Sequence, residues 1–380
     1  MTYNNPNING SNWSELNILE SLRKKNPLVI CITNDVVRTF TANGLLAIGA
    51  SPVMSECSED LKDLIVHASA LLINIGTVTP DKVTYYKEAV KLAKAHEVPI
   101  ILDPVGCHSG AYRLSVVLDL IKTGAISLLR GNQSEIKAIY DALNTNHKID
   151  SSLSGKGVDG EQVEDSAIIT YRLARQINCP VVATGEEDYV SDGTRVFAVP
   201  HGHSIMTAVT GTGCLLGAVL AAFFSSYYPF MDNLSIGEFL AYALAYYGLA
   251  GESAVKVSGV KPGIFSVAFM DALYEFDDAM LLSKNRIRPV VVPDQLKVYF
   301  ISGTQDVGFN ERHLLDTVEA ACRGGVTCFQ FREKGIGTLE GQQKLELAQQ
   351  LKEICAMYNV LYIINDDVDL AVAVNADRKS

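Results

Sequence analysis

The stretch TAVTGTGCLL, residues 207–216, decides how this chain builds its site. Gly211 and Gly213 bracket a threonine and let the backbone turn tightly and approach a ligand. The apolar run 215–224 that follows predicts a buried helix. A glycine-rich turn at a helix N-terminus points N–H groups outward at the positive end of the helix dipole, so it can hold a phosphate or a developing oxyanion. Cys214 lies in the first turn, where this field is expected to lower the pKa of its thiol. By itself, the pattern also fits a plain helix start with a buried cysteine.

Composition and charge limit the class of protein. The chain has 380 residues, 48% of them hydrophobic, which indicates roughly two to three folded domains rather than a disordered chain. Its net charge of −11 argues against non-specific binding to nucleic acid. Eight cysteines occur without paired spacing and without a CxxC motif, so a reducing compartment with free thiols is expected.

The sequence predicts no membrane segment. Residues 1–12 are polar and rich in asparagine, unlike a signal peptide or an anchor. The longest apolar run, 215–224, is far shorter than the ~20 residues of a membrane-spanning helix. We therefore expect a soluble, cytoplasmic protein with no membrane partner.

Apolar strands alternate with helices along most of the chain. This alternation predicts a mainly parallel sheet covered by helices on both faces, the α/β class. Residues 189–199 instead predict a hairpin around Asp192-Gly193. Strands are expected at 28–32, 70–75, 98–102, 126–129 and 180–184, and a short strand or a loop at 51–54. Helices are expected at 13–25, 40–48, 60–67, 80–96, 114–123, from 134 onward, 165–177, 215–224, 235–254 and 265–282, with a surface loop at 144–160.

A change of composition marks a domain boundary. Residues 284–296 contain two prolines and a basic cluster and break the rhythm of the elements. A second βα series follows, with strands at 298–301, 327–331 and 361–365 and helices at 311–323, 340–357 and from 368. The predicted organisation is a flexible tail at 1–12, a first domain at 13–283, a linker at 284–296 and a second segment at 297–380.

Polar residues of the first domain follow its strands at their C-terminal ends, which face one edge of a parallel sheet. They are Asn34, Asp35, Asp103, Arg130 and Thr184, joined by Glu135 and the turn at Gly211. Such a set suits phosphoryl transfer, which depends on positioning and charge neutralisation. Arg130 can clamp a nucleotide phosphate, and Asp103 and Glu135 can hold Mg²⁺ directly or through water. The N–H groups of the turn can face the transferred group. Neither a Walker P-loop nor a Rossmann fingerprint occurs.

Residues 14–283 resemble the hydroxyethylthiazole kinases of the ribokinase-like superfamily. The order and spacing of several short stretches carry the likeness: CITNDVV 31–37, FTANGLL 40–46, GASPVM 49–54, LDPVG 102–106, RGN 130–132, KGVD 156–159, TG 184–185 and TGTGCLL 210–216. The resemblance implies ATP- and Mg²⁺-dependent phosphorylation of the hydroxyl of 4-methyl-5-(2-hydroxyethyl)thiazole in thiamine biosynthesis or salvage. Family members are typically trimers with the thiazole site between subunits, so a homotrimer is expected.

The same resemblance assigns roles to single residues. It implies that Met54 and Gly211 contact the thiazole, that Arg130 and Thr184 contact ATP, and that Asp103 and Glu135 lie around magnesium. Asn34 is a further substrate residue or a strand cap. Thr212, Gly213 and Cys214 form the catalytic turn. Cys214 stands where most ribokinase-like enzymes have an aspartate base, and we expect it to assist deprotonation of the alcohol while the amides of the turn stabilise the transferred phosphoryl group.

Two positions depart from the family pattern, and one alternative keeps the fold. His108 follows LDPVG where small residues and threonine are usual, and we interpret it as a tolerated loop residue rather than a catalytic or metal-binding one. Gln133 replaces a common alanine, with little expected effect. The alternative substrate is a related heteroaromatic alcohol such as a hydroxymethylpyrimidine.

Residues 297–377 resemble the start of thiamine-phosphate synthase, a TIM barrel, through VYFI 298–301, GGVT 324–327, QFREK 330–334 and INDDVDLA 364–371. In that family Gln330, Arg332, Lys334 and Asn365 would bind the aminopyrimidine diphosphate, and Asp366 would bind magnesium. A barrel needs eight βα units, whereas about three are recognised here, so we expect no synthase activity from this chain alone. The segment is then a truncated gene product, one half of a split barrel, or a docking module for a separate synthase.

Overall fold

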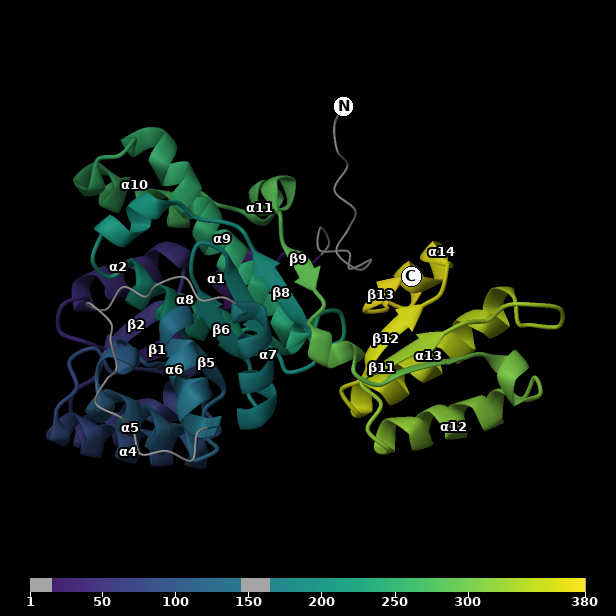
Figure 1. Cartoon of the computed structure of the whole chain (residues 1–380). Coiled ribbons are helices and arrows are strands. Elements are labelled where there is room, and N and C mark those ends of the chain that lie inside the picture. Colours follow the sequence, from purple (N-terminus) through teal and green to yellow (C-terminus); the bar gives the residue numbers. More distant parts are fainter. Residues whose placement is uncertain (1–15, 145–164, 380) are drawn as a thin grey trace. The chain divides into compact units, whose positions relative to one another are not determined.

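The computed structural model of the chain describes residues 16–144 and 165–379 (Figure 1). The chain forms two compact units. The first comprises described residues within Trp13–Asp192 and Phe197–Arg288, and the second those within Gly193–Val196 and Pro289–Ser380. The predicted tail at 1–12, the KGVD stretch at 156–159 and nearly all of the predicted loop at 144–160 lie outside the described residues.

A nine-stranded sheet forms the centre of the first unit, in the order β2-β1-β3-β4-β5-β6-β7-β8-β9. The strands from β2 to β6 pair in parallel, and β7 runs antiparallel to β6. Their bounds are β1 Leu28–Ile32, β2 Ser51–Met54, β3 Ala70–Asn74, β4 Ile100–Asp103, β5 Leu128–Asn132, β6 Val181–Thr184, β7 Asp188–Ser191, β8 Val196–Val199 and β9 Arg288–Val290. The mainly parallel sheet confirms the predicted fold class, and β7 and β8, neighbours in the sheet, lie on either side of the predicted turn at Asp192-Gly193.

The central strands are apolar up to their last residue because helices cover both of their faces. Every residue of β3 and β4 is buried. One core joins these strands to α3 Ser58–Leu64, α4 Pro80–Ala95, α5 Ala111–Ile121, α6 Gln133–Asn144 and α7 Ser166–Ile177. Figure 1 shows α4 and α5, in blue, away from α9 and α10, in green.

The other helices of the first unit are α1 Ile18–Lys25, α2 Arg38–Ile48, α8 Thr212–Ser225, α9 Ile236–Ser258, α10 Pro262–Glu275 and α11 Asp278–Lys284. Aromatic rings fill the space between α8 and α9, where Phe223 lies 5.7 Å from Tyr246 and 6.2 Å from Phe239. Ser235 and Glu238 start α9 with a reciprocal capping box. These helices fix α8, whose first turn contains Thr212, Gly213 and Cys214.

Several predicted boundaries are wrong by a few residues, and one predicted helix is two. The expected helix at 265–282 breaks at Phe276, because Asp277 caps a new helix by accepting a hydrogen bond from the Met280 N–H at 2.7 Å. The predicted linker at 284–296 contains the edge strand β9. Among the described residues, no helix is long and apolar enough to cross a membrane.

The second unit has a four-stranded parallel sheet, in the order β10-β11-β12-β13. The strands are β10 Tyr299–Ser302, β11 Cys328–Phe331, β12 Leu361–Ile364 and β13 Arg378–Lys379. They alternate with α12 Glu311–Arg323, α13 Gly341–Met357 and α14 Val368–Ala373, as the sequence predicts except for β13. Leu314, Val318, Leu347 and Leu351 bury the apolar faces of α12 and α13 against the sheet.

Candidate active site

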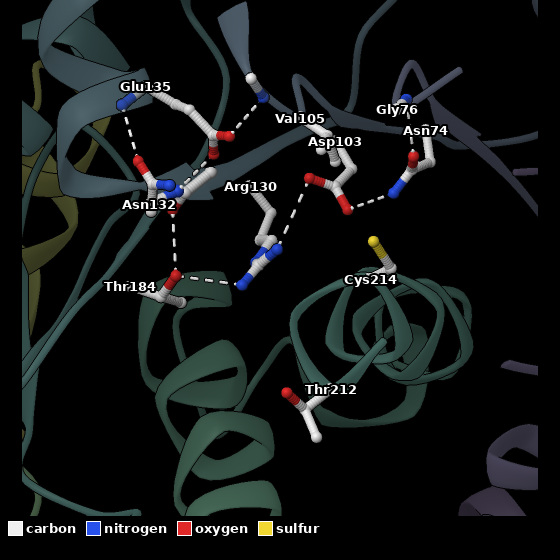
Figure 2. Close-up of polar contacts among 12 residues, drawn as sticks. Asn74, Gly76, Asp103, Val105, Arg130, Asn132, Glu135, Thr184, Thr212 and Cys214 are labelled. Atoms are coloured by element: carbon white, nitrogen blue, oxygen red, sulfur yellow. Dashed lines mark hydrogen bonds and ion pairs between the residues drawn. The ribbon is translucent and has the colours of Figure 1, made fainter. Parts of the chain in front are cut away.

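Four strands of the first sheet end at one place, and their last residues form a polar cluster (Figure 2). Asn74 ends β3 and Asp103 ends β4, and the parallel register places these two residues side by side. Thr184 ends β6 opposite Asn132 of β5. The structure therefore confirms that the C-terminal ends of these strands meet at one edge of the sheet, as the site predicted from the sequence requires.

Asp103 and Arg130 form a buried ion pair at the centre of the cluster. Nη1 of Arg130 lies 3.5 Å from Oδ1 of Asp103, and Nη2 donates to Oγ1 of Thr184 at 3.0 Å. The Asp103 side chain is fully buried, and this burial raises the pKa of its carboxyl to about 6 despite the guanidinium beside it. Nε of Arg130 is buried without a partner among the described residues.

Glu135 fastens the loops beside this pair. Its Oε1 accepts the Gly106 N–H and its Oε2 accepts the Asn132 N–H, each at 2.7 Å. The Glu135 N–H in turn donates to Oδ1 of Asn132 at 2.8 Å, which gives the start of α6 a reciprocal cap. Burial, with the charge of Asp103, raises the pKa of Glu135 to about 7.

The turn predicted to be catalytic, Thr212 to Cys214, faces the guanidinium of Arg130. Gly211 has a φ of 100°, and α8 begins directly after it. A methyl carbon added at Gly213 would lie 3.7 Å from both terminal nitrogens of Arg130, so the backbone of the first turn and the guanidinium face one another. The first N–H groups of a helix have no partners within it. This arrangement is a cradle for an anionic group.

Thr212 holds the turn rather than pointing a free hydroxyl into the cradle. Its Oγ1 donates to the carbonyl of Met206 at 2.8 Å and lies 3.1 Å from that of Val209. The Tyr247 hydroxyl donates to the Thr212 carbonyl at 2.6 Å. The Thr212 N–H also has a partner, the Val209 carbonyl at 3.4 Å.

Cys214 lies in the first turn of α8, as predicted, but the expected lowering of its pKa is wrong. Burial, with the negative charge of Asp103 nearby, raises the pKa of the thiol to about 11. Its Sγ accepts a hydrogen bond from Nδ2 of Asn34 at 3.3 Å. Desolvation of the thiolate outweighs the helix field, which the sequence alone did not show.

Asn34 connects the turn to the strand ends through Asn74, a residue that the sequence analysis missed. Nδ2 of Asn34 donates to Oδ1 of Asn74 at 3.0 Å, and Nδ2 of Asn74 donates to Oδ2 of Asp103 at 2.7 Å. The expected strand at 70–75 ran past Asn74, which hid a polar residue at a strand end. Asp35, the neighbour of Asn34, is exposed and pairs with Arg38 and Lys82 instead.

The residues predicted to contact the thiazole and those predicted to contact ATP lie at different parts of the sheet. Met54 ends β2, the outermost strand, and is half-buried beside Cys31 of β1. Gly211 lies against α2, since a methyl carbon on it would approach Val37 and Phe40 to 3.1 Å. Arg130 and Thr184, assigned to ATP, lie toward β5 and β6 instead. The cradle at Gly213 faces Arg130 of β5.

His108 belongs to a short 3₁₀ turn, Cys107–Ser109, after β4. It is buried, its Nδ1 has no partner among the described residues, and burial lowers its pKa. Gln133, the other departure, is buried too and donates to the Glu187 carbonyl at 3.0 Å. Among the described residues, no group of three or more histidine, cysteine or acidic side chains could hold a metal ion by itself.

In the second unit, the residues predicted to bind a diphosphate lie within β11 or in the loops that follow β11 and β12. Gln330 is buried within β11. The Lys334 ammonium forms an ion pair with Asp366, and Nδ2 of Asn365 donates to the same carboxylate at 3.0 Å. The Lys334 ammonium lowers the pKa of Asp366 below its usual range. Arg332 directly follows β11.

A parallel sheet whose carboxyl edge combines a buried arginine–aspartate pair with an anion-binding helix start defines a phosphotransferase site. Comparison with known proteins agrees. The hydroxyethylthiazole kinase family matches residues 19–279, and thiamine monophosphate synthase matches residues 298–379. The chain belongs to the hydroxyethylthiazole kinase family, whose members are phosphotransferases.

Individual relatives support this membership. The hydroxyethylthiazole kinase of Streptococcus agalactiae serotype Ia is 48% identical over 267 residues, which cover 70% of this chain and 99% of the relative. That of Streptococcus suis is 46% identical over 256 residues, covering 67% of this chain and 93% of the relative. The solved hydroxyethylthiazole kinase of Pyrococcus horikoshii OT3 is similar with a TM-score of 0.63 and 34% identity, over 72% of this chain and 98% of the other.

Proposed function

We propose that this chain transfers a phosphoryl group from ATP, with Mg²⁺, to the hydroxyl of 4-methyl-5-(2-hydroxyethyl)thiazole in thiamine biosynthesis or salvage. The observation that carries the proposal is the cradle formed by the first turn of α8 and the guanidinium of Arg130. Backbone N–H groups and a fixed positive charge on either side of a migrating phosphoryl group stabilise the charge of the transition state.

The nucleotide side is proposed to consist of Arg130 and Thr184. Arg130 retains a buried, unpartnered Nε, and its terminal nitrogens face the turn, so it can bind phosphate oxygens without losing Asp103. The Thr184 hydroxyl already fixes the guanidinium and donates to the Gly131 carbonyl at 3.3 Å. Arginine is well suited to phosphate because its guanidinium is planar and always charged.

Magnesium fits these residues only together with substrate phosphates. Mg²⁺ is commonly held by one or two carboxylates, phosphate oxygens and water. Asp103 can contribute, since its Oδ1 has only the long 3.5 Å contact to Arg130. Both oxygens of Glu135 accept backbone N–H groups, so Glu135 is proposed to act through water. When bound, the ion neutralises phosphate charge.

The acceptor side is proposed to consist of Met54, Gly211 and Asn34. Met54 offers a flexible, half-buried thioether to an aromatic ring. Gly211 lies close to the start of α2, where a methyl carbon on it would approach Val37 and Phe40 to 3.1 Å. The Asn34 carboxamide lies between the turn and the strand ends, where it can bind the alcohol.

Cys214 is proposed to assist removal of the alcohol proton, with the amides of the turn as the main catalytic groups. Because burial raises its pKa to about 11, the thiol is protonated at neutral pH, and its contribution as a base is small. Comparison of Cys214→Asp with Cys214→Ala tests this. Activity of Cys214→Asp no higher than that of Cys214→Ala would show that the site needs no general base there.

We propose a homotrimer, supported by an apolar stripe on α10 and its surroundings. Ile264, Val267 and Tyr274 recur at helical spacing on one face of α10, and Val257 and Val260 precede them. These five side chains are between 47% and 81% exposed, which is typical of a surface that another protein covers. Light scattering of the purified chain tests the trimer.

The cytoplasm is the proposed compartment. All eight cysteines are free, which suits a reducing environment. The metabolic role proposed for the kinase suits the same compartment.

The second unit is proposed to make no thiamine phosphate in a polypeptide of these 380 residues. Its described strands form a parallel sheet of four, whereas a closed barrel of this fold needs eight. Gln330, Arg332, Lys334 and Asn365 are proposed to face a diphosphate, and Asp366 a magnesium ion, when the remaining barrel is supplied. A docking role for a separate synthase is the alternative. Formation of thiamine phosphate by the purified chain would overturn the proposal, and a pull-down with a separate synthase tests docking.

A coupled assay of ATP consumption, with and without the thiazole alcohol, tests the kinase proposal. We expect the alcohol to stimulate ADP formation and to yield a phosphorylated thiazole by mass spectrometry. The same assay with a hydroxymethylpyrimidine tests the alternative substrate. A rate higher with the pyrimidine than with the thiazole would replace the proposal by that alternative.

A further inference from the structure

Asn74 lies where the acceptor side of the site meets the phosphate side. It is fully buried at the end of β3. On one side its carboxamide contacts Asn34, which itself contacts the Cys214 sulfur. On the other it contacts Asp103, which faces Arg130.

The orientation of this carboxamide is fixed by its neighbours. The Gly76 N–H, which can only donate, points at Oδ1 of Asn74 at 3.0 Å. Nδ2 of Asn74 therefore faces Asp103, which accepts its hydrogen bond at 2.7 Å. The carboxamide of Asn34 is oriented in the same way, because its Oδ1 accepts the Val36 N–H at 3.2 Å and its Nδ2 is left to face Asn74.

We propose that Asn74 is a positioning residue for phosphoryl transfer, which holds the Asn34 carboxamide and the Asp103 carboxylate in place through one side chain. This inference rests on the proposed function, because Asn34 acts there on the alcohol and Asp103 on the phosphate side. A buried network in which every member is satisfied fixes its geometry more firmly than isolated pairs do. The hydrogen bonds of Arg130 go to Asp103 and Thr184.

Asn74→Leu removes both hydrogen-bonding ends and keeps the number and branching of the heavy atoms. We expect an affinity for the thiazole alcohol about tenfold weaker, measured by calorimetry without ATP, and a kcat at least about tenfold lower, because two buried groups lose partners. The KM for ATP should stay within about twofold of the original, since the nucleotide residues keep their contacts.

The matched control is Leu173→Ala, which removes a fully buried side chain of α7 that does not contact the site. A purely structural role for Asn74 predicts that Asn74→Leu behaves like this control, with a lower melting temperature but unchanged kcat, ATP KM and alcohol affinity per folded molecule. That result would overturn the proposal. A chain without thiazole kinase activity before substitution would instead refute the proposed function.

Asn74→Ser is made in parallel, since Asn74→Leu can fail to fold. Its hydroxyl can reach Asn34 or Asp103 through water, so it should restore part of the loss with the same pattern: weaker alcohol binding, lower kcat and unchanged ATP KM. Kinetic constants of Asn74→Ser equal to those of the original chain would overturn the proposal. Failure of both variants to fold would do the same, because Asn74 would then support the fold rather than the site.

Discussion

The carboxamide of Asn34 packs directly against Gly76, with no room for a side chain between them. A methyl carbon on Gly76 would lie 2.8 Å from Nδ2 and 2.9 Å from Cβ of Asn34. Gly76 also orients Asn74 through its N–H. Gly76, which follows the end of β3, therefore limits where the side chain of Asn34, the proposed acceptor residue after β1, can lie.

Gly76→Ala should therefore act on the acceptor rather than on the nucleotide. The added methyl group has to displace the Asn34 side chain, because contacts under 3.0 Å cannot be accommodated without movement. We expect the KM for the thiazole alcohol to rise about tenfold, with the KM for ATP changed less than about twofold. Steady-state kinetics with each substrate varied in turn measures both. Equal increases in the KM for the thiazole alcohol and the KM for ATP would contradict the proposal that the two substrates contact separate groups of residues.

Arg130→Met should impair both stability and nucleotide binding. It leaves the fully buried carboxylate of Asp103 without its charge partner, which in buried pairs costs about 3–5 kcal/mol. The KM for ATP should rise at least about tenfold, because the proposed phosphate clamp is gone. Denaturant unfolding and ATP titration measure the two effects. Arg130→Lys is the control: it keeps the charge and should recover stability more than it recovers ATP binding.

Kinase activity should fall as the pH decreases through about 6, because burial raises the pKa of Asp103 to about 6 and its ionised form is the one proposed for magnesium. The contribution of Asp103 to the free energy of unfolding changes with pH in the direction opposite to the activity. A carboxyl whose pKa is higher in the folded than in the unfolded chain stabilises most below its unfolded pKa of about 3.9, and that stability is lost as the pH rises through about 6. A pH series of kcat/KM and of unfolding, for the chain and Asp103→Asn, measures both. Parallel changes of activity and stability with pH would contradict this account.

Gly211→Ala should reduce activity through the conformation of the turn. Gly211 has a φ of 100°, which costs a residue with a side chain about 1–3 kcal/mol, and the new methyl group would press on Val37 and Phe40 at 3.1 Å. The control is Gly259→Ala at the end of α9, which also has a positive φ, 57°, but has open space where a methyl group would be added. We expect both variants to lose stability and only Gly211→Ala to lose kcat. Unchanged kcat in Gly211→Ala would show that the turn tolerates the distortion.

The sequence was sufficient to predict the parallel sheet and the convergence of Asp103, Arg130 and Thr184, because parallel strands place their C-terminal ends together. The sequence was not sufficient to identify Asn74 as a residue of the site, since many strands that contribute to no site also end in an asparagine. Two misses have other causes. The pKa of Cys214 depends on burial by elements far away in the chain. β13 is only two residues long and carries no periodicity.

Gly213→Ala tests the central claim, that the first turn of α8 and Arg130 cradle the transferred phosphoryl group. Alanine favours a helix more than glycine by about 0.5–1 kcal/mol, and a methyl carbon there would make only ordinary 3.7 Å contacts with Arg130 in the ligand-free chain. The decisive measurement is thiazole phosphate formation by this variant beside its melting temperature. The account predicts an activity at least about a hundredfold lower, because the methyl group would occupy the space between the turn and the guanidinium of Arg130, with no fall in melting temperature. Full activity in a folded Gly213→Ala chain would contradict it.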